Sequence, residues 1–246
     1  AKIQSETAST SYISEKARLL FLKGDEVSAK ISWQAAIDSN PGSPSVYLLV
    51  YRSLMQIRLF DFAIEILEQG REKLDNTALF QTDLAQLYSL TSQHGRAIGQ
   101  YLELLKINQN QLNYVKTQLC QFWINDQAIA KSVEVAEKGV ANEPLNRSYR
   151  ELLAWLYIEA ERFRDAFVVY QAVDRLEREE GRMLFSFAQV AADGGVYDVA
   201  LEAFDEVLRR YPEAESAPDA MRGLGVMQER WAEALGRSDG RRGGKE

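Results

Sequence analysis

The chain has 246 residues, 46% of them hydrophobic and 26% charged, a composition typical of a folded globular protein. Only 15 glycines and 5 prolines occur, which favours helices over a turn-rich β fold. The net charge of −7 disfavours nucleic acid as a partner, and a single His and a single Cys exclude a Cys/His zinc site and an intramolecular disulfide. We therefore expect no metal and no other cofactor.

The start of the chain and its apolar runs bear on its relation to a membrane. The longest uninterrupted apolar run is 46–51, whereas a membrane-spanning helix needs about 20 residues. We therefore expect no direct membrane insertion. The chain opens at Ala1 without Met and without an apolar leader, so we expect an excised fragment or a trimmed mature form, with residues 1–9 as an N-terminal flank.

From about residue 10 onward, one pattern recurs six times. A small residue is followed four positions later by a large one, and these anchors lie 34 or 35 residues apart. Residues three and four apart share a helix face, and a second small–large pair precedes the anchor in most copies, although the second copy has Tyr51 before Leu54 instead. Each copy therefore predicts two helices packed small against large. The anchors are Ala29/Trp33, Ala63/Leu67, Ala97/Tyr101, Ala166/Tyr170 and Ala200/Phe204, with Ser132 and Ala136 in a weaker fourth copy.

Helix breakers agree with this division. Gly24-Asp25 and Gly194-Gly195 fall between the two expected helices of their copies. Proline disrupts a helix interior but is tolerated in its first turn. All five prolines lie between copies, at Pro41, Pro44, Pro144, Pro212 and Pro218.

The segment LLFLKGDEVSAKISWQAAIDSNP, from Leu19 to Pro41, carries the pattern most clearly. It resembles the tetratricopeptide repeat (TPR), a helix–turn–helix unit with a period of about 34 residues. The resemblance implies an all-α fold, an α-solenoid in which antiparallel helix pairs form a right-handed superhelix. It predicts repeats at 10–43, 44–77, 78–112, 113–146, 147–180 and 181–214.

Beyond the last repeat, Met221, Leu224, Met227 and Trp231 follow one another at helical spacing. A terminal repeat exposes the face that a further repeat would cover, so we predict a capping helix at 215–235. The segment GRSDGRRGGKE, residues 236–246, has no apolar periodicity, and we predict a flexible tail.

The resemblance also implies that the first helix of each repeat lines the concave side of the superhelix. These helices carry a second stripe that packing does not require, and we predict that it binds a partner protein. Arg18 and Arg52 make one end cationic, Gln86 and Gln121 offer hydrogen bonds, and an apolar patch around Trp155 follows. The predicted contact residues are Arg18, Leu48, Arg52, Met55, Gln86, Gln121, Ile124, Trp155, Ile158, Phe185 and Gln189.

Plainer interpretations stay open beside this one. Trp155 would instead pack against a neighbouring first helix, and Arg18 and Arg52 would be solvated charges paired with nearby acids. His94 lies at an expected turn without a second metal ligand, and Cys120 occupies a small-residue packing position, which predicts a buried structural thiol. Because the sequence contains no set of residues typical of a catalytic site, we predict that the chain is not an enzyme.

The leading hypothesis is a noncatalytic scaffold that holds a segment of a partner protein in its concave groove. The alternatives are an RNA-binding helical-repeat protein, which the acidic charge disfavours, and the interaction domain of a larger enzyme or envelope-assembly protein. Self-association is left open. The last repeat resembles those of bacterial cell-envelope TPR proteins, which favours the periplasm over the cytoplasm.

Overall fold

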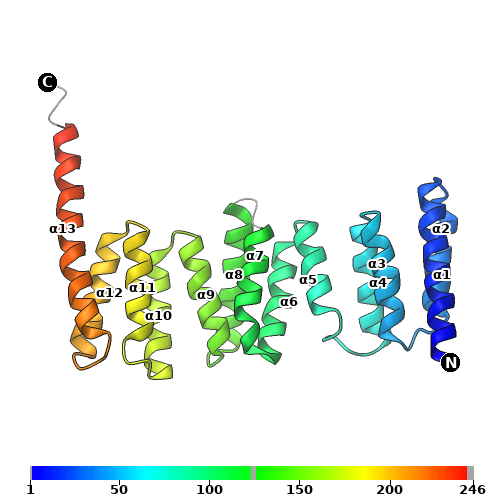
Figure 1. Ribbon diagram of the computed structural model, residues 1–246, viewed down its shortest axis with the longest axis horizontal. Helices are drawn as coiled ribbons and strands as arrows, with labels where there is room; N and C mark the ends of the chain where they lie inside the picture. The colour runs from blue at the N-terminus through cyan, green and yellow to red at the C-terminus, as the bar shows by residue number, and fades with distance from the viewer. Residues whose placement is uncertain (1, 123–125, 243–246) are drawn as a thin grey trace. The chain divides into compact units, whose positions relative to one another are not determined.

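The computed structural model describes residues 2–122 and 126–242, which fall into two compact units divided after Ile124. Apart from turns, every described element is a helix (Figure 1). Unit 1 contains α1 (Lys2–Leu22), α2 (Glu26–Asp38), α3 (Pro44–Gln56), α4 (Phe60–Lys73), α5 (Gln81–Leu90), α6 (His94–Ile107), the 3-10 turn η1 (Gln109–Gln111) and α7 (Leu112–Phe122). Unit 2 contains α8 (Asp126–Asn142), α9 (Arg147–Glu159), α10 (Phe163–Glu177), α11 (Arg182–Asp193), α12 (Tyr197–Arg210) and α13 (Ala217–Arg242).

Helices that follow one another in the chain pack as pairs. In unit 1 these pairs are α1/α2, α3/α4 and α5/α6, and in unit 2 they are α9/α10 and α11/α12. First helices also contact one another, α1 with α3 and α5 with α7, while α13 packs on α12 and α11. The expected all-α fold of consecutive antiparallel helix pairs with a capping helix is confirmed. The right-handed superhelix stays a prediction.

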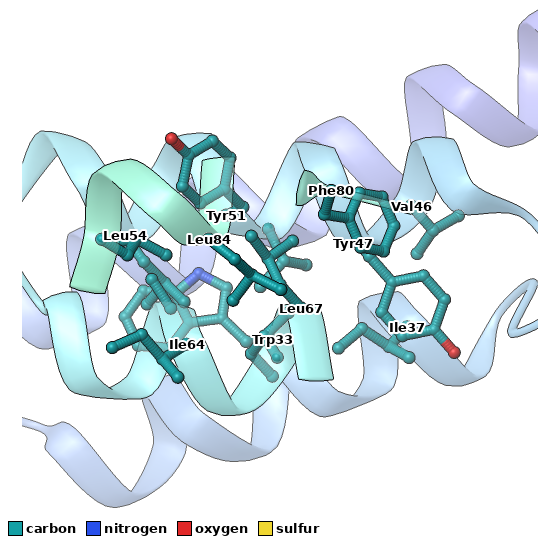
Figure 2. Packing of buried hydrophobic residues seen from close by; sticks show 14 of the residues in the cluster. Trp33, Ile37, Val46, Tyr47, Tyr51, Leu54, Ile64, Leu67, Phe80 and Leu84 are labelled. Atoms are coloured by element: carbon teal, nitrogen blue, oxygen red, sulfur yellow. The ribbon is translucent and has the colours of Figure 1, made fainter. Parts of the chain in front are cut away.

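The small–large anchors form the centre of each pair. The five anchor alanines are at most 2% exposed, and Trp33, Leu67, Tyr101 and Phe204 are buried with them. Figure 2 shows how the first core extends into the next pairs, with Trp33 near residues of α3, α4 and α5. The buried indole N–H of Trp33 is satisfied because it donates to Ser53 Oγ of α3 at 3.1 Å. Each small residue therefore makes room for a large one.

The predicted breakers end the helices as expected. Gly24 and Gly195 adopt φ of +88° and +76° in the turns within their pairs, a conformation that glycine reaches without a steric cost. Asp25 then caps α2 by accepting a hydrogen bond from the Ser28 N–H at 3.1 Å. All five prolines lie between pairs or in a first turn, and Pro44 is the first residue of α3.

Two similar polar contacts tie consecutive pairs together. In unit 1 the Tyr88 hydroxyl donates to Glu68 at 2.5 Å, and Arg96 both pairs with Glu68 and covers the Tyr88 ring. Unit 2 repeats the arrangement: the Tyr157 hydroxyl donates to Glu137 at 2.8 Å, and Arg162 pairs with the same carboxylate at 3.3 Å and covers the Tyr157 ring. We call each set of three a Tyr–Glu–Arg clamp.

Two expectations need correction. Cys120 is exposed and not a buried thiol: α7 buries Val115 and Leu119, and Cys120 is turned about 100° away from Leu119. Helix α13 continues to Arg242, well into the predicted tail: the strong helix formers at 232–235 carry it to the tail, and its last turns run on through Gly236 and Gly240. The predicted N-terminal flank, 1–9, adjoins the first repeat without a break, since α1 begins at Lys2.

Candidate functional site

The predicted contact residues differ in accessibility according to their row on the first helices. One row, spaced by 34 or 35 residues, is open: Arg52, Gln86, Gln121 and Gln189 are all exposed, and Trp155 at the same position is half-buried. We call these five residues the open row. Arg52 comes from α3, Gln86 from α5 and Gln121 from α7 in unit 1, while Trp155 comes from α9 and Gln189 from α11 in unit 2. Packing leaves this position available in helix after helix.

The neighbouring rows are more committed to the fold. Leu48 and Met55 are half-buried against the core of unit 1, and Ile158 is half-buried on α9. Ile124 lies outside the described residues. These rows line the open row on either side and contribute only part of each side chain to its surface.

Arg18 occupies the equivalent position on α1, but its side chain is paired with a residue of its own helix. Its guanidinium donates to the Glu15 carboxylate of the same helix, at 2.9 Å from Nε and 2.5 Å from the second nitrogen. This hydrogen bond raises the pKa of Arg18 and lowers that of Glu15. The plainer interpretation, a surface charge paired with a nearby acid, thus describes Arg18.

Arg52 has a different setting, which sequence reasoning missed. Its charge acts on Asp83 of α5, and burial raises the pKa of that carboxyl while Arg52 and a hydrogen bond from Tyr51 oppose the rise. Burial, followed by the Asp83 charge, raises the pKa of Tyr51 to about 12. The same carboxylate adds to the burial effect on Tyr114 of α7, which is 39% exposed. Three first helices therefore bring a cation, a carboxylate and phenols together.

In unit 2, Phe185 is partly a packing residue. Its ring lies 5.9 Å from that of Phe204 on α12, and its remaining surface lines a hollow of about 470 Å³. Charged residues from two loops and from the first turns of the helices that follow them surround this hollow. They are Arg178, Glu179, Glu180, Arg182, Glu215 and Asp219.

Sequence reasoning also missed a buried cation of unit 2. Arg150 is only 4% exposed; it pairs with Glu177 at 3.2 Å and donates to the Pro144 carbonyl. Arg147 beside it pairs with Glu151 at 2.6 Å and Glu179 at 2.9 Å. The i, i+4 spacing of Arg147 and Glu151 was the one signal in the sequence. These charges hold the start of α9 against the end of α10.

Over the part of the chain that the structure describes, no three His, Cys, Asp or Glu side chains gather as metal ligands would. None of the described helices combines the length and apolarity that crossing a bilayer requires. What recurs instead is a packed helix pair, about every 34 residues, that leaves one side chain of its first helix open. The fold is TPR-like.

Comparisons with known proteins add similarities of fold only. No family model matches the chain, and no curated protein matches it. Among solved structures, YrrB, described as a TPR protein with an unusual peptide-binding site, is 13% identical, with 77% of this chain and 97% of YrrB covered and a TM-score of 0.38. PilF of Pseudomonas aeruginosa is 14% identical, with 89% and 99% covered and a TM-score of 0.34. The C-terminal part of a TPR protein of Cytophaga hutchinsonii is 15% identical, with 84% and 80% covered and a TM-score of 0.39. The TPR-like character rests on the helix pairs of this chain themselves.

Proposed function

We propose that this chain is a noncatalytic interaction module that binds segments of a partner protein along its open row. The observation that carries the proposal is the repeated exposure of one position on successive first helices, at Arg52, Gln86 and Gln121 in unit 1 and at Gln189 in unit 2. A side chain that packing does not use, presented at a regular interval, suits contacts with an elongated ligand.

The chemistry of the row indicates what each unit contributes. Glutamine amides both donate and accept hydrogen bonds, so they match the main chain of an extended segment. Arg52 adds an exposed guanidinium, which is less strongly hydrated than an ammonium and can hold a carboxylate through two hydrogen bonds. Trp155 with Ile158 offers apolar surface, and large aromatics often dominate binding energy. We therefore expect unit 1 to bind a segment mainly through polar contacts, and unit 2, taken by itself, to bind one mainly through apolar contacts.

A peptide library displayed on phage tests the proposal. We expect selection against the full chain to enrich a family of peptides, whose synthetic versions bind in fluorescence anisotropy. Trp155→Ala or Arg52→Glu should weaken the peptides that use their own unit by about tenfold or more. Far-UV circular dichroism of each variant checks that the helices persist.

Matched variants elsewhere serve as controls. Trp231→Ala removes an indole that is 41% exposed on α13, and Lys73→Glu reverses an exposed charge at the end of α4. Both should leave peptide binding unchanged. The proposal fails when no peptide family is enriched, or when the enriched peptides bind the open-row variants as tightly as the unaltered chain.

A further inference from the structure

Two first helices of unit 1 carry the same short pattern. Helix α5 reads TDLAQ at 82–86, and α7 reads TQLCQ at 117–121, so Thr, Leu, a small residue and Gln recur at the repeat spacing. On α3 the positions equivalent to the Thr and the Gln hold Leu48 and Arg52. Packing of the helix pairs therefore does not demand the combination that α5 and α7 share.

The leucine of the pattern determines which side of each helix the other residues occupy. Leu84 and Leu119 are 0% and 3% exposed, so they face the core. On each helix the Thr and the Gln lie two residues to either side of this leucine, about 200° around the helix axis, and all four side chains are exposed. Because α5 and α7 contact each other, they present matching polar surfaces next to each other. We call these residues the polar pairs: Thr82 with Gln86, and Thr117 with Gln121.

The fold makes no use of the two glutamine amides. Within the described residues, neither Gln86 nor Gln121 donates a hydrogen bond to, or accepts one from, another group of the protein. The Thr117 hydroxyl, by contrast, donates to the Asn113 carbonyl of its own helix at 2.9 Å. Each amide therefore keeps two N–H donors that a ligand can use.

The spacing of the two helices selects the kind of main chain that both amides can reach. Packed helices lie about 8–10 Å apart. Along a β-strand, groups on one face recur every second residue, at about 6.6 Å and then at about 13 Å. In a polyproline II helix, equivalent groups recur every third residue, at about 9.3 Å, and no internal hydrogen bond uses the carbonyls. The polyproline II geometry thus places two free carbonyls at the spacing of α5 and α7.

An aromatic side chain lies on the same face of α7. Tyr114 precedes Thr117 by three residues, so the two share a helix face, and Tyr114 is 39% exposed. Burial raises the pKa of Tyr114, and the Asp83 carboxylate of α5 adds to the rise, so the phenol lies near α5. Polyproline II segments dock in grooves lined by aromatic side chains. Neutral amides beside an aromatic ring therefore suit an uncharged segment that contains proline.

We propose that the polar pairs bind a proline-rich segment of a partner protein in the polyproline II conformation. Gln86 and Gln121 donate to main-chain carbonyls three residues apart, and the Tyr114 ring packs against a proline ring. The stiffness of such a segment lowers the entropy that binding costs. This inference rests on the proposed function, since it names the class of segment that unit 1 selects.

Fluorescence anisotropy with labelled decaproline and the full chain tests this inference. We expect decaproline to bind about tenfold or more tightly than a labelled Gly-Ser peptide of the same length, which offers the same carbonyls on a flexible chain. Gln86→Ala and Gln121→Ala should each weaken binding about two- to tenfold through the loss of a hydrogen bond. Tyr114→Ala should weaken it as well, whereas Tyr114→Phe keeps the ring and should bind like the unaltered chain.

The open row supplies a matched control on another helix. Gln189→Ala removes an exposed amide at the equivalent position of α11, in unit 2, and should leave decaproline binding unchanged. Circular dichroism of each variant checks that the helices persist. The inference is overturned by a decaproline that does not bind at about 500 µM protein, by equal binding of the two peptides, or by equal effects of Gln121→Ala and Gln189→Ala.

The phage selection separates this inference from the proposed function. Enriched peptides that contain proline at three-residue spacing and lose affinity on Gln86→Ala and Gln121→Ala support both. Enriched peptides that depend on the same two glutamines but contain no proline leave the proposed function standing and overturn the polyproline II ligand.

Discussion

At the residue scale, the turn inside each helix pair demands one left-handed residue. Gly24, Arg58, Ser92, Glu161 and Gly195 occupy this place in five repeats, with φ between +57° and +88°. Only two of them are glycine. A side chain with a Cβ pays about 1–2 kcal/mol for this conformation, which the surrounding helices impose.

Replacing the strained residues by glycine should therefore stabilise the protein. For Ser92→Gly and Glu161→Gly we expect the free energy of unfolding to rise by about 0.5–1 kcal/mol, since the relief of strain exceeds the extra entropy that glycine gives the unfolded chain. Urea unfolding followed by circular dichroism measures the change. Glu103→Gly, at an exposed position inside α6, should have the opposite sign and cost about 1 kcal/mol. A loss of stability in both kinds of variant contradicts the explanation.

The Tyr–Glu–Arg clamps allow a second test on single residues. Tyr88→Phe removes only a hydroxyl, yet it leaves the Glu68 carboxylate without its phenol donor. We expect a loss of about 1–1.5 kcal/mol in unfolding free energy. Tyr12→Phe, in which the hydroxyl belongs to a side chain that is 72% exposed, should change stability by less than about 0.5 kcal/mol. Equal effects of the two substitutions would rule out a clamp.

How far the sequence predicts this structure differs from residue to residue. The anchors such as Ala29 and Trp33 are predictable because their burial follows from a strict helical period. Cys120 was misplaced because a small residue at a packing spacing does not reveal which side of its helix a neighbour covers. Asp83 was missed for another reason: its setting depends on Tyr51 and Arg52, which are remote in sequence and meet it only across helices.

At the scale of the element, α13 shows how a single helix closes unit 2. It buries Ala217, Ala220 and Met227 toward α12 and α11. Gly223 lets the helix come close, because a Cβ there would lie 2.7 Å from the ring of buried Phe204. Two residues further on, a Cβ at Gly225 would meet nothing within 4 Å. The close packing of α13 therefore requires glycine at 223 but not at 225.

Two glycine-to-alanine substitutions in α13 should thus have opposite effects. Gly225→Ala gains helix propensity, and we expect it to stabilise the helix by about 0.5–1 kcal/mol. Gly223→Ala gains the same propensity but pushes α13 away from Phe204, and we expect a net loss of about 1–3 kcal/mol. Thermal unfolding, together with limited proteolysis within α13, measures the stability of both variants. Stabilisation by Gly223→Ala would show that α13 packs differently.

At the scale of the whole molecule, tyrosines at the contacts between helix pairs link stability to pH. Burial, assisted by nearby carboxylates, raises the pKa of four of them to about 12: Tyr51, Tyr88, Tyr157 and Tyr170. The usual value for an unfolded chain is about 10. The folded protein therefore binds these phenolic protons more tightly than the unfolded one.

The sign of the pH dependence follows directly. A raised pKa in the folded state contributes stability that is complete below pH 10 and is lost as the pH rises toward 12. We expect the melting temperature to fall across this interval, and part of the tyrosinate absorbance near 295 nm to appear only with unfolding. Tyr88→Phe together with Tyr157→Phe should flatten the dependence. Full tyrosinate absorbance at pH 11 with the helices intact would contradict the prediction.

The one cysteine of the chain offers a way to observe binding that needs no engineered attachment point. Cys120 is exposed on α7 and immediately precedes Gln121 of the open row. A thiol-reactive fluorophore attached there sits beside the proposed binding surface of unit 1, and no second thiol competes for the label. A ligand bound along the row changes the polarity around the dye, so the dye emission measures binding through the single native thiol of the chain.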